Sequence, residues 1–409
     1  MSNLVKNPCP PAGRKKLKVF VAMSGGVDSS VAAALLKYGY IDSCGRFRVA
    51  RGRGPEARSS YAVIGAHMKC YNLDGCGERD AEDARRAAEV LGIPFYIFDF
   101  EKEYKDKVVE YMVDGYKKGI TPNPDVMCNK EIKFGLFLKK ALELGADYVA
   151  TGHYVKLGVR GQGLGVRKKI KNTLYPILYT LYAARDKNKD QSYFLWTLTQ
   201  KQLKHCLFPL GDITKPEVRK LAQKFNLPNA DKKDSQGICF LGRVDLKDFL
   251  KKYIPEKKGL ILDASGKVVG EHKGAWFYTI GQRSGIGLGG GKKPRYIAEK
   301  DVKENALLVA EENDPALYRK EIELKNLNFI NPDLSSLIRA NSRINVLARV
   351  RYRQPLFKAR LCQMSNVKCR LVFDRPQKFV ASGQSAVFYS AKRGDLPAGR
   401  QVLGGGIIV

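Results

Sequence analysis

The sequence lacks the features that would place the protein in a membrane or send it out of the cell. None of its apolar runs, in 409 residues, approaches the roughly 18 residues that a helix needs to span a bilayer. Residues 1–17 contain several basic side chains but no apolar core of the kind found in signal peptides. We therefore expect a cytoplasmic protein with no membrane partner, whose residues 1–17 form a flexible tail.

Patterns that bind metal are also scarce. The chain has four histidines, and Cys70 and Cys76 are spaced too widely for a Cys-x-x-Cys knuckle. The nine cysteines should stay mostly reduced in a cytosolic chain. We therefore predict no tightly bound metal. Cys70 and Cys76 have no assigned function: they could form an extra redox pair, although ordinary thiols are the simpler interpretation.

Acidic residues are few in relation to basic ones. The chain carries 72 Lys and Arg against 41 Asp and Glu, which gives a formal net charge of +31. Such an excess favours a polyanionic partner, with nucleic acid first and an anionic membrane second. A general charge excess that only aids solubility is the alternative interpretation.

The commoner nucleotide-binding loops are absent as well, because the chain has neither the Gly-Lys-Ser/Thr of a P-loop nor a fitting G-x-G-x-x-G. It has instead a buried strand over Val19–Met23, a turn over Ser24–Gly26 and an Ala- and Leu-rich helix over Asp28–Tyr38. The glycines let the backbone approach an anion, and the helix N-terminus supplies N–H groups and a positive dipole end. This stretch predicts a phosphate-binding loop, and an ordinary strand–turn–helix junction is the alternative.

Strands and helices alternate along the first part of the chain, and short β-like runs follow. Alternation predicts a parallel sheet covered by helices on both faces, with ligands beyond the carboxyl ends of the strands. We predict an α/β fold with a doubly wound parallel-sheet domain over 18–245. A small β-rich domain over 246–311 and a C-terminal β-barrel over 312–409 follow.

Several local predictions bear on the chemistry. The segment Thr121–Phe134 is predicted as a loop between two helices, with Cys128 just before a helix start, where nearby lysines would favour its thiolate. A buried structural cysteine is the alternative for Cys128. Ser192–His205 and Lys215–Phe225 are predicted as helices. The segments 46–60, 160–182 and 396–401 are predicted as insertions of unassigned role, the second forming a hairpin.

The residues Ser24 to Ser30 resemble the pyrophosphate loop of the ATP pyrophosphatase (adenine nucleotide α-hydrolase-like) superfamily. Beyond that loop, the whole chain resembles the bacterial tRNA-specific 2-thiouridylases. The matching motifs occur in family order at 22–30, 123–134, 150–154, 189–195, 234–242, 281–287, 351–354 and 383–386.

This resemblance implies a reaction. The family uses ATP with Mg²⁺ to adenylate the C2 oxygen of the wobble uridine in tRNA, releases pyrophosphate, and replaces the oxygen by sulfur as AMP leaves. Cys239 would carry the sulfur as a persulfide. Cys128 would either release sulfide from that persulfide or close a Cys128–Cys239 disulfide as sulfur leaves. Asp125 would act as a general base or position the uridine, and capping of a turn is its alternative role.

The resemblance also implies contacts. ATP would meet Ala22, Met23, Ser24, Gly25, Gly26, Val27, Asp28, Ser29, Met68 and Gly152. The tRNA anticodon arm would meet Asn123, Pro124, Asp125, His153, Lys189, Asp190, Gln191, Arg351, Tyr352 and Gln384. A histidine already satisfied within its loop is the alternative for His153. Sulfur would come from a cysteine desulfurase or a sulfur-relay protein.

Two other functions compete with this interpretation. Another enzyme of the same loop class, such as an amidotransferase-type synthetase or argininosuccinate synthase, would explain the loop but not the paired cysteines, the charge or the barrel. A non-catalytic RNA-binding protein on a retired nucleotide fold would be expected to have lost the loop residues. ATP–pyrophosphate exchange or AMP release that depends on tRNA separates the three.

Overall fold

The computed structural model describes residues 16–41, 47–49, 61–71, 73, 75–160, 178–233, 244–288, 293–330, 332, 343–365, 368–391 and 400–409. Residues 1–15 of the tail predicted over 1–17, and the motif at 234–242 with Cys239, lie outside the described residues. So do most of the predicted insertion 46–60, residues 161–177 of the predicted insertion 160–182, and residues 396–399 of the predicted insertion 396–401.

The first domain is built on a parallel sheet, as predicted. Its strands lie in the order β5 (Phe95–Asp99), β4 (Tyr61–Lys69), β1 (Leu17–Ala22), β6 (Tyr148–Thr151) and β9 (Cys206–Leu207). In the parallel register Val19 of the central strand lies opposite Val63 on one side and Tyr148 on the other. The central strand β1 thus places the predicted phosphate loop at the middle of the sheet edge.

Alternation along β1 explains why both faces of the sheet are covered. Val19 and Val21 are fully buried against a helical layer that contains α1 (Val27–Tyr38), α2 (Cys76–Val90) and α8 (Lys215–Lys224). Phe20 and Ala22 point to the other face, which helices from the segment 101–143 cover. Successive side chains of a strand point to opposite faces, so one apolar run serves two layers.

Two long helical runs on that second face each include a π-helical stretch. The first consists of α3 (Glu101–Tyr104), η1 (Lys105–Val109) and α4 (Glu110–Lys117), and the second of α5 (Pro124–Met127), η2 (Cys128–Phe137) and α6 (Leu138–Glu143). The prediction that Cys128 precedes a helix is therefore wrong. The helix already begins at Pro124, because Asn123 caps it by accepting the Val126 N–H at 3.2 Å and proline fits the first turn.

The prediction for Ser192–His205 is also wrong, since this stretch holds two short pieces, η3 (Ser192–Leu195) and α7 (Gln200–Leu203). A capping box between Thr199 and Gln202 starts the second piece afresh. The predicted helix at 215–225 is confirmed as α8, where Thr214 donates to Glu217. A hairpin is present, but its first strand, β7 (Val155–Arg160), ends at the first residue of the segment predicted to form it and pairs with β8 (Leu178–Ala183). A small pair, β2 (Gly39–Ile41) with β3 (Phe47–Val49), was not predicted.

The remaining chain forms two β units, preceded by the short helix α9 (Leu246–Leu250). The small central domain has the strand order β11 (Val268–His272), β10 (Gly259–Leu262), β13 (Ala306–Glu311) and β12 (Arg295–Asp301). The C-terminal domain is the predicted barrel, closed and antiparallel. Its order is β14 (Tyr318–Phe329), β17 (Lys368–Lys378), β16 (Phe357–Ser365), β15 (Ile344–Arg349), β18 (Ser385–Ser390) and β19 (Val402–Ile408).

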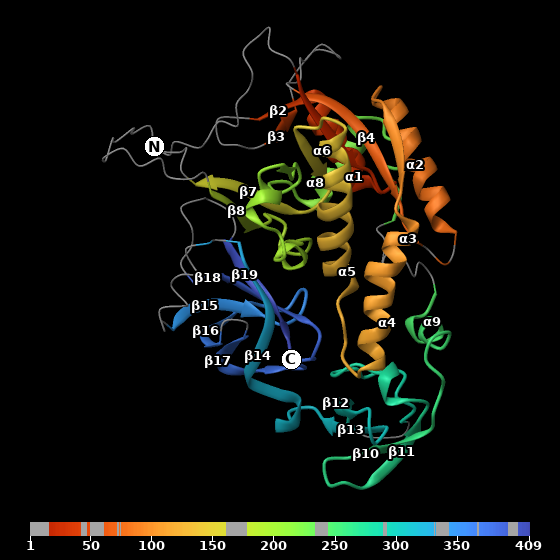
Figure 1. Ribbon diagram of the computed structural model, residues 1–409, viewed down its shortest axis with the longest axis vertical. Coiled ribbons are helices and arrows are strands. Elements are labelled where there is room, and N and C mark those ends of the chain that lie inside the picture. Colours follow the sequence, from red (N-terminus) through yellow and green to blue (C-terminus); the bar gives the residue numbers. More distant parts are fainter. Residues whose placement is uncertain are drawn as a thin grey trace.

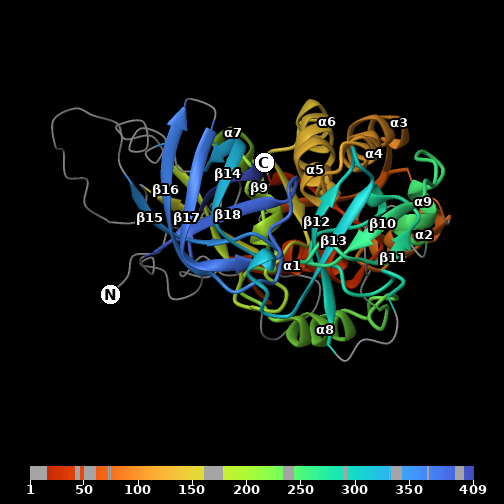
Figure 2. The same cartoon turned by 90° about the horizontal axis from the view of Figure 1, so that it is seen from below.

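The barrel and the central domain lie on one side of the first domain and next to each other (Figures 1 and 2). The Thr121 N–H, just before α5, donates to the Ser382 carbonyl of the barrel at 2.7 Å. Arg351 of the barrel donates to the Ile280 carbonyl of the central domain at 2.6 Å. The segment leading into Asp125 and Cys128 is therefore held where the domains meet. In the described part of the chain, no helix is long and apolar enough to cross a membrane.

Candidate active site

The loop after β1 has the geometry of an anion-binding turn. Gly25 has a φ of +74°, a left-handed conformation that glycine adopts without strain. The Ser24 N–H donates to Ser29 Oγ at 3.1 Å, and Ser29 Oγ donates to the Gly26 carbonyl at 3.1 Å. Among the described residues, no side chain caps α1 at Gly26. The first turn of α1 thus presents backbone N–H groups and the positive end of its dipole at the loop.

The other residues predicted to meet ATP lie at the same edge of the sheet. Met68 is near the end of β4, and Gly152 follows β6, the two neighbours of β1. A Cβ at Gly152 would lie only 2.7 Å from the Ser29 nitrogen, so this glycine allows close packing against the first turn of α1. Met23 is fully buried and hydrogen-bonded through its N–H to the Ala66 carbonyl at 2.8 Å. The predicted set is therefore contiguous around the loop.

Asp28, in the first turn of α1, is fixed by two donors on one oxygen. The Tyr154 hydroxyl donates to Asp28 Oδ1 at 2.7 Å, and Lys215 Nζ donates to the same atom at 2.7 Å. Tyr154 comes from the segment after β6 and Lys215 from the first turn of α8, so three elements meet at this carboxylate. These contacts hold the carboxylate beside the loop.

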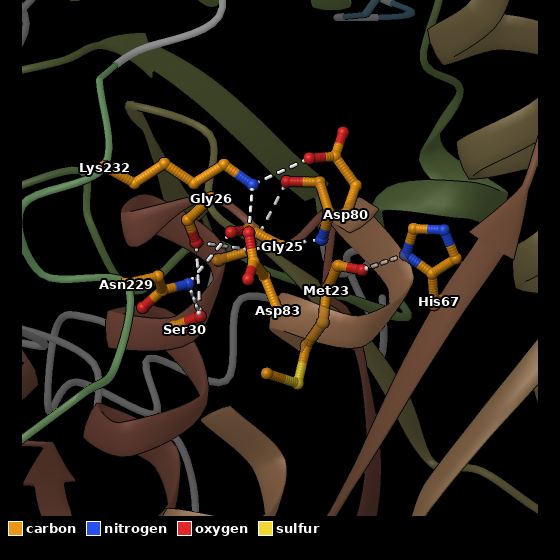
Figure 3. A network of polar contacts seen from close by, with 11 residues as sticks. Met23, Gly25, Gly26, Ser30, His67, Asp80, Asp83, Asn229 and Lys232 are labelled. Carbon is orange, nitrogen blue, oxygen red and sulfur yellow. Dashed lines mark hydrogen bonds and ion pairs between the residues drawn. The ribbon is translucent and has the colours of Figure 1, made fainter. Parts of the chain in front are cut away.

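A polar network that the sequence reasoning missed completes the loop (Figure 3). Asn229 Nδ2 donates to the Gly25 carbonyl at 2.9 Å and to Ser30 Oγ at 3.0 Å. Lys232 Nζ bonds to Asp80 Oδ1 at 2.7 Å and to Asp83 Oδ2 at 2.6 Å, both on α2. One indication in the sequence that these residues belong to the site was their position: Asn229 and Lys232 stand just before the motif at 234–242.

Asp125 and Cys128 lie in an environment that disfavours their ionised forms. Burial raises the pKa of Asp125, and the nearby Lys133 acts against that shift. Burial also raises the pKa of the Cys128 thiol, and Asp125 adds to the rise, while Lys133 and a hydrogen bond with Tyr104 oppose it. The expectation that Cys128 has a favoured thiolate is therefore wrong for this structure. The thiol is 7% exposed inside a helix instead of standing at an open helix start.

His153 is a buried, neutral ring. Its Nδ1 lies 2.8 Å from Thr151 Oγ1, and its ring is 5.9 Å from Phe134 and 6.5 Å from Phe208 between centroids. Burial lowers the pKa of His153 well below 6.5, and Lys133 lowers it further. The structure therefore shows His153 with a hydrogen-bonding partner in its own segment, and its contact with tRNA stays a prediction. Asn123 and Pro124 are likewise buried, the first as the cap of α5.

The predicted tRNA residues of the segment 189–191 mostly serve contacts within the protein. Asp190 Oδ2 pairs with the Arg349 guanidinium of the barrel at 2.8 Å, and both side chains are more than nine-tenths buried. Asp190 Oδ1 also accepts the N–H groups of Ala184 and Ser192. Gln191 Oε1 accepts the Tyr154 N–H at 2.9 Å, and Lys189 is half-buried. In this structure Asp190 thus links the first domain to the barrel.

The predicted barrel residues lie at the same junction. Tyr352 packs on Phe194 with ring centroids 4.5 Å apart, next to Arg351. Gln384 Nε2 donates to the carbonyl oxygens of Thr121 and Pro122, at 3.0 and 3.2 Å. Gln384 therefore supports the connection between α4 and α5 that leads into Asp125. The contact of these barrel residues with tRNA stays a prediction, as does the meeting of Cys128 with Cys239.

Within the described ranges, no cluster of three or more His, Cys, Asp or Glu residues is arranged to hold a metal ion.

A parallel sheet, a Gly-rich turn at the N-terminus of the first helix and a separate C-terminal barrel define a class of protein with an adenine nucleotide α-hydrolase-like domain. The comparisons agree with that class. Residues 17–243 match the family described as tRNA methyl transferase HUP domain. Residues 247–311 match the tRNA methyl transferase PRC-barrel domain, and residues 319–408 match the Aminomethyltransferase beta-barrel domain.

Curated relatives identify the family within this class. The chain is 44% identical over 383 residues to a protein of Geobacillus kaustophilus strain HTA426 named tRNA-specific 2-thiouridylase MnmA 1, covering 92% of this chain and 93% of the relative. It is 40% identical over 421 residues to tRNA-specific 2-thiouridylase MnmA of Karelsulcia muelleri, with 96% and 99% covered. For the Neisseria gonorrhoeae protein of the same name, identity is 41% and coverage is 95% of each chain. The chain therefore belongs to the tRNA-specific 2-thiouridylase family.

Proposed function

We propose that this protein uses ATP to replace the C2 oxygen of the wobble uridine in tRNA by sulfur. The observation that carries the proposal is the loop at the N-terminus of α1. Its two glycines, the hydroxyl of Ser29 and the side chains of Asp28 and Asn229 surround a turn whose backbone suits a phosphate chain. Membership of the 2-thiouridylase family supplies the substrate class.

The first step is an adenylation. The C2 carbonyl oxygen of uridine attacks the α-phosphorus of ATP, an oxygen–phosphorus bond forms, and the bond from that phosphorus to the bridging oxygen breaks to release pyrophosphate. A poor leaving oxygen thereby becomes part of AMP, a good leaving group. Asp125, whose pKa burial raises, is suited to orient the base or to take up its N3 proton. Asp28, Asp80 and Asp83 are the carboxylates beside the loop that could meet a Mg²⁺ ion arriving with ATP.

The second step transfers sulfur from a persulfide on Cys239. In one route the terminal sulfur attacks C2 and AMP leaves; the Cys128 thiolate then attacks the Cys239 sulfur, which frees the C2 thiocarbonyl. In the other route Cys128 attacks the persulfide first, releasing sulfide that attacks C2. Both routes oxidise the two thiols to one disulfide, so a dithiol reductant must restore them. Because Cys128 is buried, its thiol must become accessible for this step.

The partners follow from charge and chemistry. A net charge of +31 supports binding to the tRNA backbone, and the domain junction around Tyr352 and Gln384 is the proposed place for the anticodon arm. The persulfide on Cys239 would be supplied by a cysteine desulfurase, directly or through a sulfur-relay protein.

Mass spectrometry of tRNA nucleosides tests the proposal. The protein is incubated with tRNA, ATP, Mg²⁺, a cysteine desulfurase and cysteine. A 2-thiouridine derivative is expected, and it should disappear when ATP is omitted or when Cys239 is replaced by Ser. If tRNA binds but no thionucleoside forms, a non-catalytic RNA-binding protein explains the chain better. ATP–pyrophosphate exchange that needs no tRNA would favour another synthetase of the same loop class.

A further inference from the structure

The backbone that carries Lys232 is fixed to the phosphate loop. Asn229 ties the segment to the Gly25 carbonyl and to Ser30. Arg219, on α8, donates to the Ala230 carbonyl at 3.0 Å and to the Lys232 carbonyl at 3.2 Å. Because these bonds hold the main chain, the Lys232 ammonium can change position only through rotation of its own long side chain.

That ammonium now lies between two carboxylates of α2. Its distances to Asp80 and Asp83 are 2.7 and 2.6 Å, and the side chains of all three residues are about one-third exposed, at 30%, 34% and 34%. Asp80 touches the loop, since a Cβ at Gly25 would lie 2.2 Å from the Asp80 carbonyl oxygen. Figure 3 shows the ammonium bonded to both carboxylates, and Asn229 bonded to the loop. Lys232 is thus a cation at the edge of the site where phosphates are proposed to bind.

The charges around this ammonium favour a change of its partner when ATP binds. Two carboxylates and one ammonium give the group a net charge of −1 next to a loop proposed to accept the triphosphate of ATP. Ion pairs that are partly exposed to solvent are weak, typically worth up to about 1 kcal/mol, whereas a phosphate oxygen offers a strong charge-assisted bond. A triphosphate on the loop would therefore compete for the ammonium.

We propose that Lys232 is a ligand of the ATP phosphates and that its ammonium exchanges its pairing with Asp80 and Asp83 for the phosphates when ATP binds. This inference rests on the proposed use of ATP. Binding of ATP draws the ammonium from α2 to the phosphates, where it offsets their charge and that of the departing pyrophosphate. Lys232 is then a specificity residue for the β- and γ-phosphates, and nucleotides that lack them gain nothing from it.

Binding measurements with full-length Lys232→Gln test the inference, using ATP, AMP and pyrophosphate as separate probes by isothermal titration calorimetry. We expect the affinity for ATP and for pyrophosphate to fall by about 10- to 100-fold, because one hydrogen bond between charged groups is lost. The affinity for AMP should change by less than about threefold. Lys232→Arg should restore most of the ATP affinity, because it keeps the charge.

A matched control is Lys251→Gln, which removes an ammonium that also bridges two carboxylates, Asp248 and Glu256, at 3.1 and 3.4 Å but outside the loop. It should leave all three affinities unchanged. A second variant, Asp80→Asn with Asp83→Asn, is titrated with ATP without divalent cations. It should bind ATP at least as tightly as the parent, because its ammonium no longer has to leave two carboxylates.

The contrary outcomes are separable. Equal losses of ATP and AMP affinity in Lys232→Gln would assign the lysine a purely structural role, and an unchanged ATP affinity would remove it from the site. A loss of ATP affinity in the double Asp variant as large as that in Lys232→Gln would show that only the link to α2 matters. If the parent protein binds ATP but the variants give any of these contrary results, the role of Lys232 is refuted and the proposed function stands. If the parent binds neither ATP nor pyrophosphate, the proposed function fails with it.

Discussion

Replacing Gly25 by Ala should disrupt the loop, whereas the same change one residue later should be tolerated. Gly25 has a φ of +74°, a conformation that costs an L-residue about 1–2 kcal/mol. Its added Cβ would also lie 2.2 Å from the Asp80 carbonyl oxygen and 2.9 Å from the Asp80 carbonyl carbon. These are backbone atoms of α2, so they cannot rotate away and the helix or the loop must move. We expect a loss of about 2–4 kcal/mol in the free energy of unfolding.

Gly26 provides the matched control. Its backbone is extended, with φ −86° and ψ 161°, and the nearest atom to an added Cβ is Ser24 Oγ at 3.5 Å. Ala restricts the unfolded chain and so stabilises by about 0.4–1 kcal/mol, and this offsets the similar cost of Ala at a helix N-cap. Gly26→Ala should therefore change the free energy of unfolding by less than about 1 kcal/mol.

Urea denaturation followed by far-UV circular dichroism measures both variants, and ATP titration of Gly25→Ala adds a second readout. We expect Gly25→Ala to lower the stability and to abolish ATP binding. Equal stability of the two alanine variants would refute the reasoning, because it would mean that the left-handed turn and the close approach of α2 contribute nothing.

Three further predictions concern buried charged and titratable groups. Asp190→Ala should destabilise the protein by about 3–5 kcal/mol in the same urea assay, because it leaves the Arg349 guanidinium buried without its carboxylate; adding Arg349→Met should recover part of that loss, and strict additivity would contradict the pairing. Alkylation of Cys128 by iodoacetamide, followed by peptide mapping, should be slow at pH 8 and still rise above about pH 9, since burial raises the thiol pKa. Asp125→Asn removes a charge that raises this pKa and should accelerate alkylation; a rate that levels off near neutral pH would show a thiolate instead. Because burial lowers the pKa of His153, the unfolded chain gains a proton more readily below about pH 6.5, so stability should fall as the pH drops from about 7 to 5. His153→Gln should make that fall shallower, and an unchanged slope would argue against a neutral buried ring.

The fold could be predicted from the sequence because its elements carry local signals. The run Val19–Met23 is apolar on both faces, as a strand buried between two helical layers must be, and the structure confirms it at the centre of the sheet. Short β-like runs predict the C-terminal barrel, and the closed barrel is confirmed as well. The helix around Cys128 could not be placed correctly, because two prolines indicated a loop while the second one in fact starts the helix after the Asn123 cap.

The site was predictable only where its residues are contiguous or match a known motif. Asn229 contacts Gly25 across 204 positions of sequence, and Lys232 reaches Asp80 across 152, and no periodicity reports such contacts. The burial of individual side chains was the other property that the sequence could not predict. It reverses the expected pKa shift of Cys128. It also places Asp190, whose contact with tRNA stays a prediction, in a buried ion pair between two domains.

The central claim is that the C2 oxygen of uridine attacks the α-phosphate of ATP, and an oxygen label tests it most directly. A tRNA whose wobble uridine carries ¹⁸O at C2 is incubated with the protein, unlabelled ATP, Mg²⁺ and a persulfide source, and the AMP is analysed by mass spectrometry. The proposed mechanism predicts one ¹⁸O atom in each AMP formed, in a quantity equal to the 2-thiouridine produced. AMP that carries no ¹⁸O while 2-thiouridine accumulates would contradict the adenylated intermediate.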